Sequence, residues 1–82
     1  MHLDDIKKQL IDALELERDM LANNGVDNED HNKTINYLKT GKVEHSGDID
    51  EEEFPILYCA KEDLTTLCMD YLGYDLETLR NY

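Results

Sequence analysis

Residues 3–23 read LDDIKKQLIDALELERDMLAN, and their apolar residues recur at spacings close to three and four. This period is that of an α-helix with one buried face. The face is formed by Leu3, Ile6, Leu10, Ala13, Leu14, Met20 and Leu21. Asp4 and Asp5 lie in the first turn and Asn24-Gly25 follows the last, as is typical of a helix start and stop. The pattern predicts a helix over about residues 3–23.

Three residues of this helix depart from a simple amphipathic pattern. Glu17 stands where the next apolar residue is due, and Ile11 and Leu16 fall outside the apolar stripe. The apolar face is therefore broad. We expect it to contact two neighbouring elements.

A second, shorter helix is predicted over about residues 28–39. Asp27 is suited to cap its start, with Asp30 at the third helical position. Gly41 ends it. Residues 41–50 hold two glycines, a serine and almost no apolar residue, which is typical of a solvated loop.

A third helix is predicted over about residues 53–72, where apolar residues follow a 3-4-3-4 spacing. Pro55 must lie in its first turn, because a proline deeper inside would clash with the preceding turn. We therefore expect the helix to begin two or three residues before Pro55. An alternative is a short strand over residues 54–59 with the helix starting near Lys61, since a continuous apolar run has no diagnostic period.

Together these segments predict an all-α fold, a small bundle of three to four helices in a single domain over residues 1–82. Gly73 ends the third helix, and a last short helix is expected over residues 75–80, capped by Asp75. A domain of this size buries only about 60% of the surface that its unfolded chain exposes. Because its core alone contributes about 3–5 kcal/mol, a homodimer or a bound partner would add needed stability.

The chain carries 20 acidic and 8 basic residues, a net charge of −12. Such a charge repels anionic membranes and nucleic acids, so neither is expected as a direct ligand. The N-terminus lacks the basic and apolar regions of a secretory signal. On one shared helix Cys59 and Cys68 would lie about 13.5 Å apart, so we expect free thiols, which suit a reducing compartment. We therefore expect a cytoplasmic protein, in a bacterium or an infected host cell.

Neither a catalytic site nor a metal site is predicted. The three histidines fall in separate segments and are expected at the surface, namely His2, His31 and His45. Apolar and acidic surroundings keep both cysteines unreactive. Read as a twelve-residue calcium loop from Asp48, the sixth residue is Glu53 where glycine is required, and the twelfth is Cys59 where glutamate is required. We expect no enzyme, no metal and no cofactor.

Negative charge is concentrated in the second half of the chain. From Glu44 to Glu53 six of ten residues are acidic and none is basic, and residues 43–82 have a net charge of −9. One interpretation is that Glu51–Glu53 stabilise the positive end of the third helix while the other acids keep the chain dissolved. The other is a binding surface, because clustered charge destabilises a small domain through self-repulsion and exceeds what capping requires.

The binding interpretation predicts an acidic protein that inhibits or neutralises a basic, nucleic-acid-handling protein such as a nuclease. Basic patches that hold phosphates would accept dense carboxylates, which is the principle of nucleic-acid mimics. The predicted partner-binding residues are Glu44, Asp48, Asp50, Glu51, Glu52 and Glu53, with Tyr74 and Tyr82 as aromatic anchors. The alternative is a structural adaptor, small chaperone or homodimer subunit, in which apolar residues meet a partner helix. That contact would comprise Ile11 or Leu16 beside Leu76 and Leu79.

In size, acidity and helix count the chain is similar to the immunity proteins of nuclease bacteriocins and to phage-encoded inhibitors of restriction or CRISPR nucleases. The immunity family carries paired tyrosines followed by a proline on a short helix. Residues 53–58 read EFPILY here, so the proline precedes the tyrosine. No residue role of that family is carried over to this chain.

Overall fold

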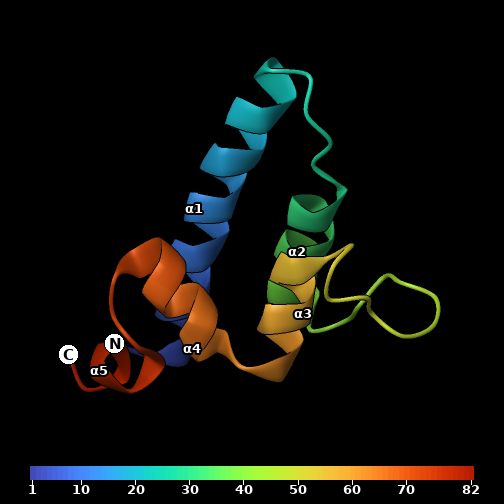
Figure 1. Cartoon of the computed structure of the whole chain (residues 1–82). Coiled ribbons are helices and arrows are strands. Elements are labelled where there is room, and N and C mark those ends of the chain that lie inside the picture. Colours follow the sequence, from blue (N-terminus) through green and yellow to red (C-terminus); the bar gives the residue numbers. More distant parts are fainter.

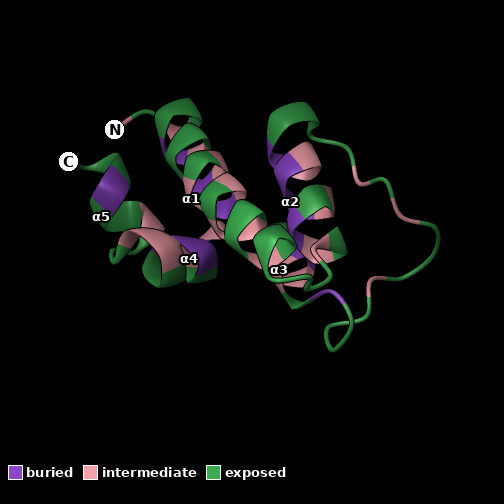
Figure 2. Cartoon of the chain, turned by 90° about the horizontal axis from the view of Figure 1, so that it is seen from above, coloured by how far each residue is buried: buried purple, intermediate pink, exposed green.

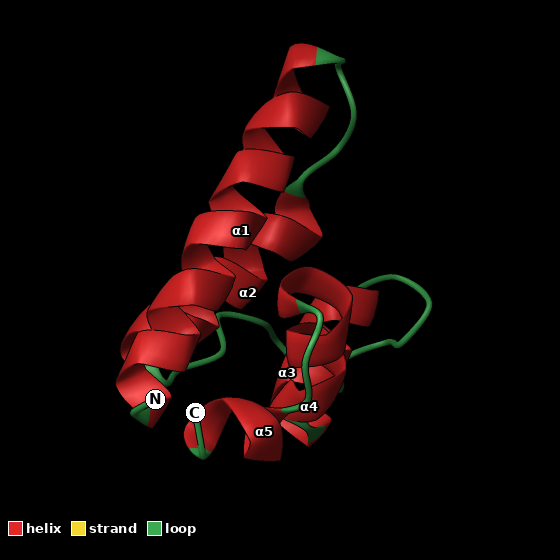
Figure 3. Ribbon diagram, turned by 90° about the vertical axis from the view of Figure 1, so that its left-hand side faces the viewer, coloured by secondary structure: helices red, strands yellow, loops and turns green.

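The computed structural model describes residues 1–82 and shows an all-α fold (Figure 1), which confirms the predicted fold class. Its elements are α1 (Leu3–Asn23), α2 (Glu29–Thr40), α3 (Pro55–Glu62), α4 (Leu64–Leu67), the π-helical turn η1 (Cys68–Leu72) and α5 (Leu76–Arg80). Figure 3 shows helices and loops and no strand. The alternative of a strand over residues 54–59 is therefore wrong.

Helix α1 has the predicted bounds and is the longest element of the bundle. Its start is capped by His2, whose Nδ1 accepts a hydrogen bond from the backbone N–H of Asp4 at 3.1 Å. Ile6, Leu10 and Leu14 are completely buried. After a short loop the chain returns antiparallel as α2, and the last turns of α1 extend beyond the start of α2 (Figure 1).

Helix α2 lies within one residue of its predicted bounds, but its start differs in detail. Asn28 is the N-cap residue and makes no side-chain capping bond. Asp27 Oδ1 instead accepts a hydrogen bond from the backbone N–H of Glu29 at 3.0 Å. At the other end Gly41 has φ 76°, a left-handed conformation that glycine adopts without steric cost and that ends the helix.

The single helix predicted over residues 53–72 is wrong in two respects. It begins at Pro55 and not before it. Proline suits the first helical position, because the N–H of a residue there has no acceptor within the helix and its absence costs no hydrogen bond. It also breaks at Asp63, which is extended (φ −162°, ψ 118°). The Asp63 side chain accepts a hydrogen bond from the N–H of Thr65 at 2.9 Å and so caps a new helix. The break lets α3 pack against α2 while η1 packs against α1.

The last helix, α5, is close to the prediction, and Asp75 caps it as expected. Its Oδ1 accepts a hydrogen bond from the N–H of Thr78 at 2.6 Å. Hydrogen bonding from the Thr78 side chain, and then from its backbone N–H, holds the pKa of the Asp75 carboxyl below its ordinary value. None of the helices combines the length and apolar composition needed to cross a bilayer.

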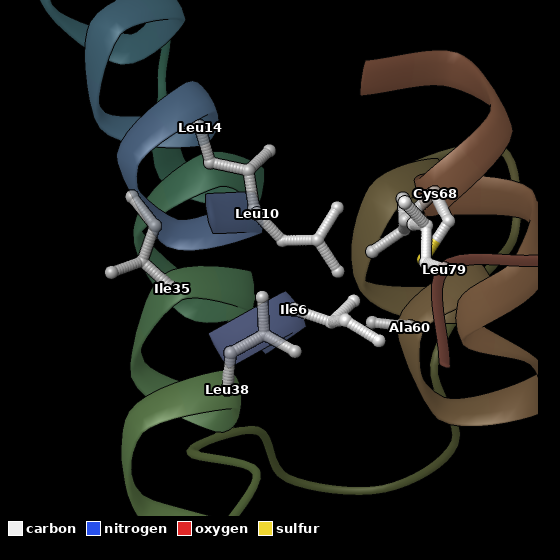
Figure 4. Packing of buried hydrophobic residues seen from close by; sticks show 9 residues of the cluster. Ile6, Leu10, Leu14, Ile35, Leu38, Ala60, Cys68 and Leu79 are labelled. Atoms are coloured by element: carbon white, nitrogen blue, oxygen red, sulfur yellow. The ribbon is translucent and has the colours of Figure 1, made fainter. Parts of the chain in front are cut away.

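The core lies between α1 and the elements on either side of it (Figure 4). Its members are Ile6, Leu10, Leu14, Ile35, Leu38, Ala60, Leu67, Cys68 and Leu79. In Figure 4 the side chains of Ile6 and Leu10 point toward Cys68 and Leu79. Helix α1 thus contacts α2 on one side and η1 and α5 on the other, which confirms the expectation that its broad apolar face meets two neighbours.

Candidate functional site

The six acidic residues predicted to bind a partner lie on the connection between α2 and α3. We name this connection, residues 41–54, the acidic loop. It projects from one side of the bundle (Figure 1), and Figure 2 shows it exposed over most of its length. The carboxylates of Glu44, Asp48, Asp50, Glu51, Glu52 and Glu53 are all exposed. None of them forms an ion pair with a basic residue of the chain.

Two residues fasten the acidic loop to the bundle. Phe54 is 4% exposed, and the ring of His45 packs edge-on against it with a centroid distance of 5.0 Å. Lys33 of α2 places its ammonium 5.6 Å from the centre of the Phe54 ring and donates a hydrogen bond to the backbone carbonyl of Glu44 at 2.7 Å. The loop therefore has fixed contacts near its start and at its end.

The most acidic part of the loop forms a single tight turn. The carbonyl of Asp50 accepts a hydrogen bond from the N–H of Phe54 at 2.8 Å. The Asp50 side chain also accepts a hydrogen bond from the N–H of Glu52 at 2.8 Å. Four successive carboxylates, from Asp50 to Glu53, are thereby held on one turn of backbone and exposed to solvent.

The start of α3 does not use these acids. Asp30 of α2 spans the gap between the helices, and its two carboxylate oxygens accept hydrogen bonds from the N–H groups of Ile56 (2.9 Å) and Leu57 (3.0 Å). No acidic residue lies in the first turn of α3. The hydrogen-bonding cap of α3 is therefore supplied by Asp30, and Glu51–Glu53 accept no hydrogen bond from the start of this helix.

A shallow hollow of about 610 Å³ lies between the acidic loop and α3. Loop residues such as Asp48 form one wall, and Tyr58, Lys61 and Glu62 of α3 form the other. Lys61 is the one lysine or arginine lining it.

The two tyrosines predicted to act as anchors lie elsewhere. Tyr74 and Tyr82 are 53% and 83% exposed, with ring centroids 6.4 Å apart. They belong to the C-terminal segment, which Figures 1 and 2 place on the opposite side of the bundle from the acidic loop. The structure thus divides the predicted binding residues between two separate surfaces.

A partly buried polar network was not anticipated from the sequence. Glu17 Oε1 lies 2.6 Å from His31 Nε2 and accepts a hydrogen bond from the Tyr71 hydroxyl at 2.8 Å. Since a carboxylate only accepts, His31 Nε2 carries the donated proton. His31 is 7% exposed, so the expectation that it lies at the surface is wrong. The interruption of the apolar stripe by Glu17 was the only sequence signal of this network.

The network perturbs the acid–base properties of two of its members. The hydrogen bond from His31 holds the pKa of the Glu17 carboxyl below its ordinary value of 4.5. Burial, reinforced by the hydrogen bond and charge of Glu17, raises the pKa of the Tyr71 hydroxyl well above its usual range. Glu17 therefore stays ionised and Tyr71 neutral near pH 7. The three side chains join α1, α2 and η1.

The apolar contact of the adaptor interpretation is not present at the surface. Leu79 is 4% exposed, and Ile11 and Leu76 pack against the core. Only Leu16 is open to solvent, at 67% exposure. That part of the prediction is wrong, because α5 folds back onto α1 and buries Leu79 between them.

Both cysteines are free thiols with raised pKa values, as expected. Burial is the main cause in each case, and neighbouring carboxylates add to it. We expect neither Cys59 nor Cys68 to react rapidly with Ellman's reagent at neutral pH in the folded protein, and both to react in urea. A native Cys59 that reacts at the rate of the unfolded chain would contradict this.

Nowhere does the structure bring three or more histidine, cysteine, aspartate or glutamate side chains into an arrangement that could hold a metal ion. No family model, no curated protein and no solved structure matches the chain.

Proposed function

We propose that this chain is an acidic binding protein that docks its acidic loop on the basic surface of a nucleic-acid-handling protein and thereby neutralises it. One observation carries the proposal. The six carboxylates of the loop are exposed, form no ion pair and do not cap α3, because Asp30 has that role. Their mutual repulsion costs a small domain stability without a compensating ion pair inside the chain. Such charge is explained by a partner that supplies the opposite charge.

The geometry of the turn over residues 50–53 suits a phosphate-binding surface. Its four carboxylates follow one another on a backbone turn closed by a bond from residue 54 to residue 50. Duplex DNA also presents closely spaced negative charges. A basic groove that holds nucleic acid would meet concentrated negative charge at this turn.

Preorganisation supports the same function. The contacts of Phe54 and Lys33 hold the loop in place before any partner arrives. On binding a partner, the loop therefore loses less conformational entropy than a disordered acidic tail would lose. The net charge of −12 also steers a basic partner toward the chain and accelerates encounter at low salt.

The test is charge reversal of the three loop glutamates. The variant E51K/E52K/E53K is expected to bind basic nucleic-acid-binding proteins at least about tenfold more weakly at low salt, since three attractive charges become repulsive. Wild-type binding should fall steeply as salt rises. The measurement is capture from the heparin-binding fraction of a cell lysate, with mass spectrometry and titration of each captured protein. Added duplex DNA should compete with the wild-type chain for those proteins.

The matched control is D4K/D70K/E77K, which changes the net charge equally but on exposed residues of α1, η1 and α5, outside the acidic loop. It should retain most of the binding, because the effect of the loop is local and not merely one of total charge. Circular dichroism verifies that both variants stay helical. The proposal is wrong if the loop variant binds as the wild type does, or if the two variants lose binding equally.

A further inference from the structure

A shallow apolar groove of about 340 Å³ lies between α1 and the C-terminal segment. Six of its seven lining residues are hydrophobic, and the groove is bounded by Met1 and Gln9 on one side and by Leu72, Tyr74 and Tyr82 on the other. Figure 3 faces this side of the molecule, where the two chain ends lie next to one another beside α5. The groove is therefore distinct from the acidic loop, which projects on the far side (Figure 1).

The apolar row of α1, Leu16 and Met20, lies on the same helix face as the groove residue Gln9. Gln9, Ala13, Leu16 and Met20 are spaced by four, three and four residues, so they share that face, where Gln9 is polar and Ala13 is partly buried. Leu16 is 67% exposed and Met20 is 59% exposed. Leu16 and Met20 therefore add exposed apolar area on the helix face that borders the apolar groove, which is a feature of interaction surfaces.

Carboxylates border this apolar row. Asp5, Asp12 and Asp19 recur every seven residues, which places them in a neighbouring row along the same flank of α1. All three are exposed, and only Asp19 pairs with a base, Arg18, at 3.3 Å. Lys8 is the single basic residue on this flank and forms no ion pair.

We propose that the groove and the adjoining row of α1 bind a basic amphipathic helix of a partner protein. Apolar residues at positions i, i+3, i+4 and i+7 of that helix would fill the groove and cover Leu16 and Met20. Its lysines and arginines would lie against Asp5, Asp12 and Asp19. A second copy of the chain fits poorly, because two molecules of charge −12 would bring like-charged rims together. This inference concerns a second surface and does not depend on the function proposed for the acidic loop.

The test uses a dye-labelled peptide of about two heptads, with leucine at the a and d positions and lysine elsewhere, in fluorescence anisotropy. The variant L16S/Y82S removes two exposed apolar side chains and should keep its helical circular dichroism. It is expected to bind the peptide at least about tenfold more weakly than wild type, as loss of an interface anchor does. D5K/D12K/D19K should weaken binding by a similar factor.

Two comparisons separate this surface from the acidic loop. E51K/E52K/E53K should change the affinity for the patterned peptide by less than about threefold, since the remote charges are screened beyond about 8–10 Å. A peptide of the same composition in scrambled order lacks the apolar face and should not distinguish wild type from L16S/Y82S. These results would support binding of a basic helix at the groove, whether or not E51K/E52K/E53K reduces the capture of basic proteins.

Three outcomes would overturn the inference. The first is equal binding of the patterned peptide by wild type and L16S/Y82S. The second is equal binding of a peptide in which glutamate replaces every lysine, which would show that the carboxylate rim has no role. The third is a wild-type dimer in sedimentation that L16S/Y82S dissociates, because a second copy would then occupy the groove.

Discussion

Replacement of Asp30 by alanine is expected to destabilise the fold by about 2–4 kcal/mol. Its carboxylate accepts hydrogen bonds from the N–H groups of Ile56 and Leu57, across 26 and 27 residues of chain. Hydrogen bonds to charged groups are worth about 1.5–3 kcal/mol each, and part-buried donors left without an acceptor add a desolvation penalty. The core of so small a domain supplies only about 3–5 kcal/mol. Asp30→Ala should therefore leave a domain that is only marginally stable.

Urea titration followed by far-ultraviolet circular dichroism measures this effect. Asp27→Ala is the matched control, because Asp27 also accepts one backbone hydrogen bond, but at the exposed start of its own helix. That change should cost at most about 1 kcal/mol, as for an ordinary cap. Asp30→Asn, which keeps one acceptor oxygen, should fall between them. Equal destabilisation by Asp30→Ala and Asp27→Ala would show that the link from α2 to α3 is not important.

Replacement of Glu17 by alanine is expected to cost about 1–3 kcal/mol, because buried His31 and the Tyr71 hydroxyl both lose their acceptor. The change removes the polar contacts of α1 with α2 and with η1 at once. Glu15→Ala is the control, since Glu15 makes only longer ion pairs to Arg18 (3.9 Å) and Lys39 (3.7 Å) at the surface. Surface pairs of this kind contribute about 0–1 kcal/mol. Comparable losses from the two substitutions would contradict the structural role of the network.

The same network predicts a pH dependence with a defined sign. The folded pKa of Glu17 lies below its ordinary value of 4.5. Its contribution to stability is therefore fully present above about that value and is lost as the pH falls through the folded pKa. In Glu17→Gln the side chain no longer titrates. The difference in unfolding free energy between wild type and Glu17→Gln should shrink as the pH is lowered from 7 to below 4.5, and a constant difference would refute the prediction.

The two surfaces have different physical characters. The acidic loop presents charge without apolar area, whereas the groove beside Tyr74 and Tyr82 presents apolar area with charge at its border. Binding at the loop should be fast and sensitive to salt, because charge acts mainly on the encounter rate. Binding at the groove should retain a salt-resistant component from buried apolar area. The two can be measured independently on one protein.

The sequence by itself determined the elements whose signals are local. The period of residues 3–23, the glycine at position 41 and the cap at Asp75 predicted α1, the end of α2 and the start of α5, because helix hydrogen bonds and caps join residues that are close in the chain. The acidic stretch from Glu44 to Glu53 was likewise visible, and its exposure is confirmed. The break at Asp63 was local in origin but was obscured by an apolar spacing that continues across it.

Only the tertiary structure decided which distant residues meet. Asp30 caps a helix 26 residues away, and Glu17 bonds a tyrosine 54 residues away. It also placed Tyr74 and Tyr82 on the opposite side from the acidic loop, and it buried Leu79, which the sequence had suggested as a contact residue. The reason is physical. The apolar period of a segment shows which face of a helix is buried. It does not show which other helix packs against that face or at what angle, and this packing determines which distant residues come into contact.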